Sequence, residues 1–175
     1  MSALSDFIIP IVGLKLGDHS YQFEVDREFF KEFNNAELEQ GHLHVDLTLT
    51  KRSNLIELVF LLKGKLKSFC DRCGGELYLP IDCEEMRIVK FSEQDYDTTD
   101  DVLILRPNEH ELNVSHIIYE ALVLGMPIRK SHNKEINGQI CDSEVLDKLK
   151  EYQEKDVTND VDHRWSALKK LLTDK

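Results

Sequence analysis

The sequence has no long hydrophobic run and no basic leader segment. No apolar stretch reaches the roughly 18 residues that a membrane-spanning helix requires. The apolar residues from Phe7 to Val12 follow no basic segment, so the start of the chain does not resemble a signal peptide. We therefore expect a cytoplasmic protein without a membrane partner, and we expect it to be a monomer. Hydrophobic residues, 41% of the 175, are enough to form one core.

The sequence also lacks the motifs on which most assignments of enzymes depend. It contains no glycine-rich phosphate loop, no G-x-S-x-G nucleophile turn and no H-E-x-x-H metal motif, and its seven histidines are scattered. No nucleophile or acid–base set can be assembled, so we predict that the protein is not an enzyme. Two enzymatic alternatives stay open. One is a metal-dependent nuclease that uses His132 with the carboxylates of residues 95–101, and the other is a thiol redox protein.

Cysteines are few, and their spacing carries the main chemical signal. In a reducing cytosol the four cysteines are not expected to form disulfides. The run Cys70-x-x-Cys73-Gly-Gly, between two predicted strands, is typical of a zinc knuckle. A tetrahedral site needs two more ligands, and the best candidates are His132 and Cys141, in the irregular stretch after the central helix. Cys83 is a third candidate, although a small buried hydrophobic residue explains it better.

Three interpretations of the Cys70–Cys73 pair stay open: a structural zinc site, a metal-free remnant of such a site, and a redox pair. A thioredoxin-like redox pair requires the motif at a helix N-terminus, whereas this one lies in a predicted β-turn. A sphere of three cysteines and one histidine leaves no open position for a substrate. Zinc bound here would therefore stabilise structure.

Hydrophobic periodicity predicts an α+β fold built on an antiparallel β meander or open barrel. Alternating or β-branched segments predict strands at residues 21–25, 43–49, 55–67, 77–91 and 102–105. Gly64 leaves open a bulge in the third of these strands. A short helix is expected after Asp26, and residues 92–101 form an acidic loop.

One central helix and a helical C-terminal region complete the predicted fold. Asn113 is the expected N-cap of a helix from Val114 to Leu124, which Gly125 and Pro127 terminate. Residues 144–172 read as two helices separated by an acidic break at 156–162. We predict a single domain over residues 1–155, followed by a linker and a C-terminal amphipathic helix over residues 156–175.

Positive charge is concentrated in one part of an acidic chain. The formal net charge is −11, yet residues 51–72 carry six basic and two acidic residues. Lys63, Lys65 and Lys67 alternate along one predicted strand and therefore share a face, which leads to Arg72 at the knuckle. We interpret these four residues as a phosphate-facing strip. The alternative is an edge strand whose lysines prevent aggregation.

The C-terminal segment is the second candidate binding surface. Trp165, Leu168, Leu171 and Leu172 form an apolar stripe at helical spacing, flanked by Arg164, Lys169 and Lys170. A helix this short is marginal alone in water and needs a surface to pack on. Its own domain is one such surface, and a groove on a ribosomal protein or assembly factor is the other, which we favour.

Four segments in a fixed order point to a family. They are Cys70-Asp-Arg-Cys73, the helix from Leu112 to Pro127, the stretch from His132 to Cys141, and the terminal run from Asp162 to Leu171. Together they resemble the YceD-type large ribosomal RNA subunit accumulation proteins, over roughly residues 40–172. Many members carry a second cysteine pair after the central helix, where this chain offers only His132 and Cys141.

The resemblance implies a non-enzymatic role in the accumulation of large-subunit ribosomal RNA, with a ribosomal RNA precursor, a basic ribosomal protein or an assembly factor as partner. An acidic chain gains no general advantage on nucleic acid, because counterion release depends on Lys and Arg. Any contact with RNA must therefore be local, and a basic protein partner is equally consistent with the charge.

Overall fold

The computed structural model describes residues 3–33, 38, 40–92, 102–106 and 108–152. The chain divides into two compact units, Met1–Cys141 and Asp142–Lys175, which we treat separately. The predicted boundary at residues 155 and 156 lies outside the described residues and stays a prediction, as do the acidic loop and the C-terminal binding residues Arg164, Trp165, Leu168, Lys169 and Lys170.

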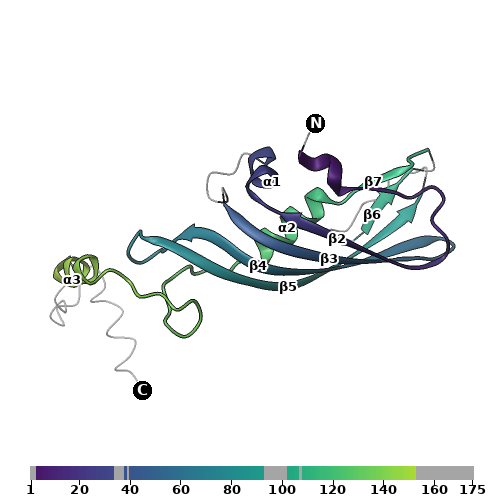
Figure 1. Cartoon of the computed structure of the whole chain (residues 1–175). Helices are drawn as coiled ribbons and strands as arrows, with labels where there is room; N and C mark the ends of the chain where they lie inside the picture. Colours follow the sequence, from purple (N-terminus) through teal and green to yellow (C-terminus); the bar gives the residue numbers. More distant parts are fainter. Residues whose placement is uncertain (1–2, 34–37, 39, 93–101, 107, 153–175) are drawn as a thin grey trace, which may run out of the picture. The chain divides into compact units, whose positions relative to one another are not determined.

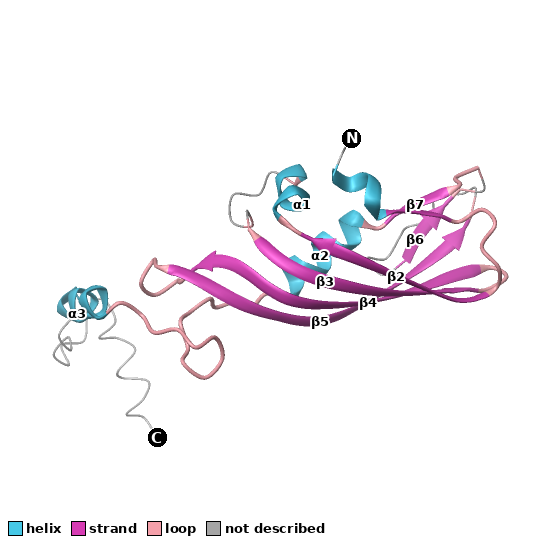
Figure 2. Cartoon of the chain, viewed as in Figure 1, coloured by secondary structure: helices cyan, strands magenta, loops and turns pink. Residues whose placement is uncertain are grey.

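A five-stranded sheet forms the first unit, with the strand order β2-β3-β4-β5-β6 (Figures 1 and 2). Its strands are β2 (Gly17–Val25), β3 (Gly41–Lys51), β4 (Leu55–Phe69), β5 (Glu76–Phe91) and β6 (Val102–Leu105). The first four form an antiparallel meander, and β6 pairs with β5 in parallel. Strands β1 (Ile8–Pro10) and β7 (Glu111–Asn113) form a second, two-stranded sheet. The predicted α+β meander is confirmed, and the sheet is open.

The described helices are η1 (Ala3–Phe7), α1 (Arg27–Glu32), α2 (Ser115–Gly125) and, in the second unit, α3 (Ser143–Tyr152). The carboxylate of Asp26 accepts hydrogen bonds from the backbone N–H groups of Glu28 and Phe29, which starts α1 as predicted. Within the described part of the chain, no helix is long and apolar enough to cross a bilayer.

The start of α2 differs by one residue from the prediction. The N-cap position is held by Val114, whose side chain offers no hydrogen bond. Asn113 lies one residue earlier, in β7, and its Oδ1 still accepts from the backbone N–H of Ser115 at 2.9 Å. The capping function was therefore assigned to the right side chain, but the helix begins one residue later because Asn113 is needed to pair with Ile8 of β1.

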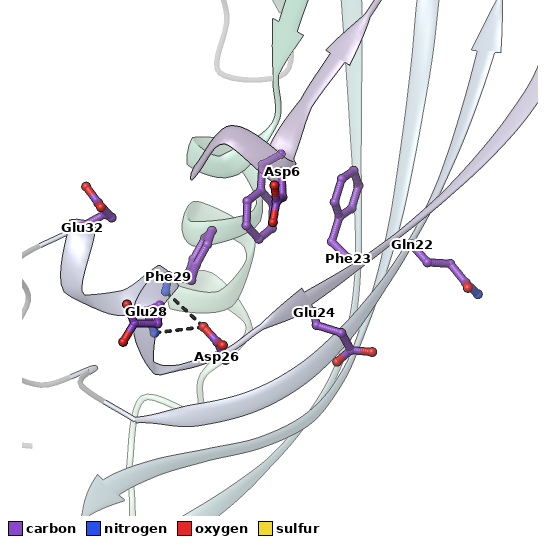
Figure 3. Close-up of a pocket in the computed structure, with 9 residues that line it drawn as sticks. Asp6, Gln22, Phe23, Glu24, Asp26, Glu28, Phe29 and Glu32 are labelled. Carbon is purple, nitrogen blue, oxygen red and sulfur yellow. Dashed lines mark hydrogen bonds between the residues drawn. The ribbon is translucent and has the colours of Figure 1, made fainter. Parts of the chain in front are cut away.

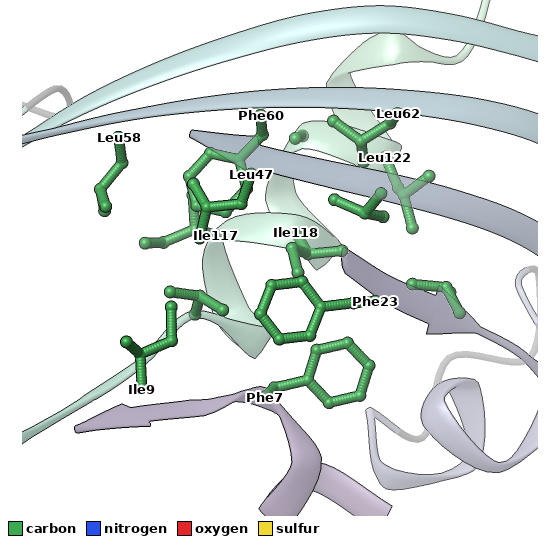
Figure 4. Close-up of a cluster of buried hydrophobic side chains, with 14 of the residues drawn as sticks. Phe7, Ile9, Phe23, Leu47, Leu58, Phe60, Leu62, Ile117, Ile118 and Leu122 are labelled. Atoms are coloured by element: carbon green, nitrogen blue, oxygen red, sulfur yellow. The ribbon is translucent and has the colours of Figure 1, made fainter. Parts of the chain in front are cut away.

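The hydrophobic core lies between one face of the sheet and α2 (Figure 4). Alternate residues of β2 to β5 point to this face, as do Phe7 and Ile9 of the N-terminal segment. At the C-terminal end of α2 the helix lies so close to β5 that a Cβ on Gly125 would come within 2.7 Å of Cys83 Sγ. The other residues of each strand form an outer face whose side chains are exposed or half-buried.

The β4–β5 hairpin extends past β3. The last pair between β3 and β4 joins Gly41 to Leu66, whereas β4 and β5 stay paired as far as Phe69 and Glu76. This extension has a small core of its own, because Ser68, Leu77 and Leu79 are buried but lie outside the main hydrophobic cluster. We call residues 67–79 the hairpin end.

Gly64 marks a close approach of two strands and not a bulge. The register runs without interruption through Gly64, which pairs with Leu43 on one side and Ile81 on the other. A Cβ at this position would collide with the backbone oxygen of His42 and would lie 2.6 Å from Leu43 Cα. The bulge that the sequence left open is therefore absent, and glycine is required by the spacing between β3 and β4.

We expect Gly64→Ala to lower the free energy of unfolding by about 1–3 kcal/mol, because backbone atoms of β3 must move to admit the methyl group. Lys65→Ala is the matched control: it changes the next residue of the same strand, whose side chain is exposed, and should stay within about 0.5 kcal/mol of the parent. Urea denaturation measures both, and equal stabilities would contradict the close-approach explanation.

Candidate functional site

Four side chains from two distant segments meet at the hairpin end. The ligand atoms of Cys70, Cys73, His132 and Cys141 all lie within 4.8 Å of one another. Cys70 Sγ and Cys141 Sγ are 3.8 Å apart, and Cys73 Sγ lies 3.3 Å from His132 Nδ1. Around a tetrahedral zinc ion, two sulfurs lie about 3.8 Å apart, and a sulfur and an imidazole nitrogen about 3.6 Å. The predicted four residues are therefore brought together at separations that fit a metal ion.

The turn that carries the two leading cysteines is held by its own backbone. Cys70 donates its N–H to the Gly75 oxygen, and Gly74 donates to the Cys70 oxygen, both at 2.8 Å. Gly74 has a φ of +71°, a conformation that favours glycine because it has no Cβ. The Cys-x-x-Cys-Gly-Gly run thus forms a tight turn with both sulfurs on one side, as predicted from the sequence.

His132 has the tautomer that a metal ligand needs. Its Nε2 lies 2.8 Å from the backbone oxygen of Glu76. A carbonyl oxygen only accepts, so Nε2 carries a proton, and in the neutral form of the ring Nδ1 then presents its lone pair toward Cys73. Histidine ligands in metal sites commonly donate their second N–H to a carbonyl or carboxylate in this manner.

The irregular segment after α2 is tied to the hairpin end at several points. Asp71 donates its N–H to the Lys130 oxygen at 2.7 Å, and its carboxylate accepts from the Lys130 N–H at 2.6 Å. Farther along, the side-chain oxygen of Gln139 accepts from the Tyr78 N–H at 3.1 Å. These contacts bring the segment that carries His132 and Cys141 against the hairpin end.

Burial and charge act differently on the two buried cysteines. Burial raises the pKa of Cys70, but hydrogen bonds from the backbone N–H groups of His132, Cys73 and Arg72 outweigh it, so its pKa lies below the ordinary value. Burial, together with the neighbouring sulfurs of Cys70 and Cys73, raises the pKa of Cys141 to about 11. Several thiolates so close together require a compensating cation, which is the electrostatic condition that a divalent metal meets.

Cys83 does not belong to this cluster. It lies half-buried on β5 against α2, where its Sγ donates to the Ala121 oxygen at 3.8 Å. Burial raises its pKa, and Glu85 and Asp82 raise it further. These contacts agree with the interpretation of Cys83 as a small apolar packing residue. The fourth residue of the cluster is His132, for which Cys83 was the alternative.

The predicted basic strip lies on the outer face of β4. Lys63 and Lys65 are exposed there, and Lys67 pairs with Glu76 across the hairpin at 2.5 Å. Its hydrogen bond to Glu76 raises the pKa of Lys67. Lys63 and Lys65 pair with β3 on one side and with β5 on the other, so for these two lysines the alternative of protection of a sheet edge is wrong. Lys67 lies beyond the last pair between β3 and β4, where the hairpin has only two strands. Arg72 is exposed in the turn that follows.

The two enzymatic alternatives receive no support from the described residues. Both ring nitrogens of His132 are already engaged, one by Glu76 and one toward Cys73, and the carboxylates of residues 95–101 lie outside the described residues. The Cys70–Cys73 pair lies in a turn between β4 and β5, whereas a thioredoxin-like redox pair lies in the first turn of a helix.

One further cavity, which the sequence did not predict, is acidic (Figure 3). It has a volume of about 590 Å³ and is lined by Asp6, Phe7, Gln22, Phe23, Glu24, Asp26, Glu28, Phe29 and Glu32. Several of its carboxylates have structural partners, since Asp26 caps α1 and Glu28 pairs with Lys31 at 2.7 Å. Such a lining repels phosphate, so the cavity is no place for a nucleic acid.

Comparison with known proteins gives one result that bears on this chain. A search of curated proteins and a search of solved structures each find no match. A protein-family model described as "Large ribosomal RNA subunit accumulation protein YceD" matches residues 58–172, which include the whole Cys/His cluster and the basic strip. More than half of the chain is matched, and the protein therefore belongs to the YceD family of large ribosomal RNA subunit accumulation proteins.

Proposed function

We propose that the protein is a non-enzymatic binding factor that contacts large-subunit ribosomal RNA through the basic strip, on a hairpin end held rigid by one zinc ion. The family description supports a role in the accumulation of this RNA. The observation that carries the proposal is the meeting of the four-residue cluster and the lysines of β4 at one end of one hairpin.

Zinc fits this cluster better than a hard cation does. Three sulfurs and an imidazole nitrogen suit zinc, whereas magnesium and calcium prefer oxygen ligands. Bound zinc would supply a closed tetrahedral link between the Cys70 turn and the segment from His132 to Cys141, with no open position for a substrate. Its contribution is therefore rigidity at the hairpin end, where the small separate core gives little.

The strip offers phosphates a local excess of cations in an acidic chain. Among the described residues, no ion pair forms with Lys63 or Lys65, and both side chains are exposed. Lysines on a rigid strand can contact successive phosphates without first ordering a loop. For the C-terminal segment we propose a second contact, with a ribosomal protein or assembly factor, on the grounds of its apolar stripe and flanking cations.

Purified protein is expected to contain one zinc ion per chain by elemental analysis, and Cys70→Ser should lose it because the sphere then has three ligands. Cys83→Ser is the matched control, since Cys83 lies outside the cluster and a hydroxyl can still donate to the Ala121 oxygen. Absence of zinc from the parent after anaerobic reconstitution, or its retention in Cys70→Ser, would contradict the proposed site.

Removal of zinc by a chelator should loosen the hairpin end and leave the main core intact. We expect faster backbone hydrogen exchange in residues 67–79 and 128–141, because the buried Leu77 and Leu79 lie outside the main hydrophobic cluster. Exchange in β2 and β3, which pack in that cluster, should be unchanged. Equal acceleration throughout would show that the cluster supports the whole fold.

The double variant Lys63→Glu/Lys65→Glu should weaken binding to large-subunit ribosomal RNA fragments. The slope of log affinity against log salt should become shallower by about 0.7 for each phosphate that a lysine no longer neutralises. The double variant Lys15→Glu/Lys90→Glu is the control, because it makes the same change of net charge at exposed lysines of the same unit outside the strip. If both variants lose the same affinity, only net charge matters, and the strip is not the binding surface.

A further inference from the structure

Two large aromatic rings are exposed at the hairpin end. Phe69 keeps 58% of its surface exposed and Tyr78 keeps 46%. By contrast, the phenylalanines Phe7, Phe23, Phe29, Phe30 and Phe60 are buried in the core. Exposing an aromatic ring forgoes a large gain from burial. The packing of the fold therefore gives no reason for aromatic residues at these two positions.

The two rings and the lysines share the outer face of the hairpin. Lys67 pairs with Tyr78 in the register, and Phe69 pairs with Glu76, so Phe69 and Tyr78 are diagonal neighbours across β4 and β5. Diagonal neighbours on one face lie within reach of the same ligand. Lys65 and Lys63 continue the same face along β4, and Lys65 pairs with Pro80, which carries no charge.

We propose that this face binds single-stranded RNA, with Phe69 and Tyr78 stacking on two unpaired bases while Lys65 and Lys63 contact the phosphates beside them. Bases in a duplex are already stacked on one another, so only an unpaired segment can place a base on a protein ring. Stacking of this kind contributes roughly 5- to 150-fold in affinity per base. The inference rests on the proposed function and specifies which part of the RNA is bound.

The charges around the rings favour a nucleic acid over a protein partner. An apolar protein surface would have to bury Lys65 and Lys67 beside the two rings, which is costly because lysine is strongly hydrated. Glu76 pairs with Phe69 in the register, and its carboxylate is held by Lys67 at 2.5 Å. It therefore does not present a free negative charge to an approaching phosphate.

The segments that carry the Cys/His cluster hold the backbone beside both rings. Phe69 directly precedes Cys70, and the backbone N–H of Tyr78 is bound by Gln139 in the segment that also carries His132 and Cys141. A ring on a fixed backbone has less conformational freedom to lose when a base stacks on it. Rigidity at this end, which the zinc site would supply, is then a requirement for affinity and not only for stability.

The test uses the full-length, zinc-loaded protein and a single-stranded oligoribonucleotide of about 12 nucleotides, a length within the range of known single-strand sites. One internal base is 2-aminopurine, whose fluorescence falls when it stacks, and a blunt duplex of the same sequence is the second probe. Phe69→Leu/Tyr78→Leu keeps apolar side chains but removes the π faces. Phe69→Tyr/Tyr78→Phe keeps the π faces and is the matched control.

We expect the leucine variant to bind the single strand at least about 20-fold more weakly than the parent, which corresponds to the loss of two stacked bases at the lower end of the range. The 2-aminopurine quenching should disappear, and duplex binding should not change. The control variant should retain both affinity and quenching. Zinc content and melting temperature of each variant confirm that the fold is kept, as expected for exposed positions.

Two results would overturn the inference, and they differ in what they say of the proposed function. If the leucine variant binds the single strand as tightly as the parent does, while Lys63→Glu/Lys65→Glu still weakens this binding, the stacking proposal is wrong and the proposed role of the basic strip is kept. If neither variant changes binding to either probe, both proposals fail. Equal loss of single-strand and duplex binding in the leucine variant would also contradict stacking.

Discussion

The arrangement of the hairpin end depends on one constraint, the closing of the Cys70–Cys73 turn against the segment from His132 to Cys141. A two-stranded ribbon is marginal alone in water, because it has too little apolar surface to bury. Beyond Leu66 the β4–β5 hairpin is such a ribbon, with only a few buried residues of its own. The backbone bonds between Asp71 and Lys130 begin this closure, and the side chains of Cys70, Cys73, His132 and Cys141 meet inside it. If the proposed zinc binds there, order at this end depends on the metal more than order elsewhere in the unit does.

The core of the first unit is held by apolar packing on the inner face of the sheet and not by the Cys/His cluster. The residues that stabilise the fold are therefore different from the residues that we propose for binding. Helix α2 and the N-terminal segment cover one face of the sheet, where Ile118 and Phe60 belong to one continuous apolar cluster (Figure 4). The buried Arg87 adds a polar link at this interface, since it pairs with Glu85 and lies 3.8 Å from Glu120 of α2. Because the core requires only the inner face, residues of the outer face are free to vary in charge and shape. Phe69, Tyr78 and the lysines all lie on that outer face.

Sequence reasoning predicted the features that depend on residues close together in the chain, and it missed those that depend on which segments pack side by side in the fold. Strict alternation of polar and apolar residues predicted β3. The Cys-x-x-Cys spacing, together with one downstream histidine and one downstream cysteine, predicted all four residues of the cluster. This was possible because a tetrahedral ion needs four ligands and few residue types can supply them. Alternation predicts which face of a strand a lysine occupies but not which strands lie beside it. The sequence could therefore not show that Lys63 lies on a central strand and not on an edge strand. The parallel pairing of β6 and the close approach at Gly64 are likewise non-local. Phe69 was overlooked because an aromatic residue in an apolar strand is ordinarily part of a core.

Cations and carboxylates alternate across the outer face of the sheet, and this limits where a polyanion can lie. Lys63 on β4 pairs with His44 on β3 and with the exposed Asp82 on β5, and His44 pairs in turn with Glu24 on β2, so carboxylates lie on both sides of this lysine. His44 donates to Glu24 at 2.7 Å, and this bond raises the pKa of His44. Glu24 also lines the acidic cavity (Figure 3). At physiological salt the field of an exposed charge fades over about 8 Å, so Asp82 reduces the attraction of Lys63 for phosphate more than that of Lys65, which pairs with Pro80. On the proposed function, an RNA at the hairpin end would meet Lys65 and Lys67 and then the two aromatic rings, whereas toward β2, or along β5 toward Asp82, it would meet carboxylates. The proposal therefore lets an acidic protein bind RNA at one end, because its negative charge elsewhere on this face excludes RNA from the other directions.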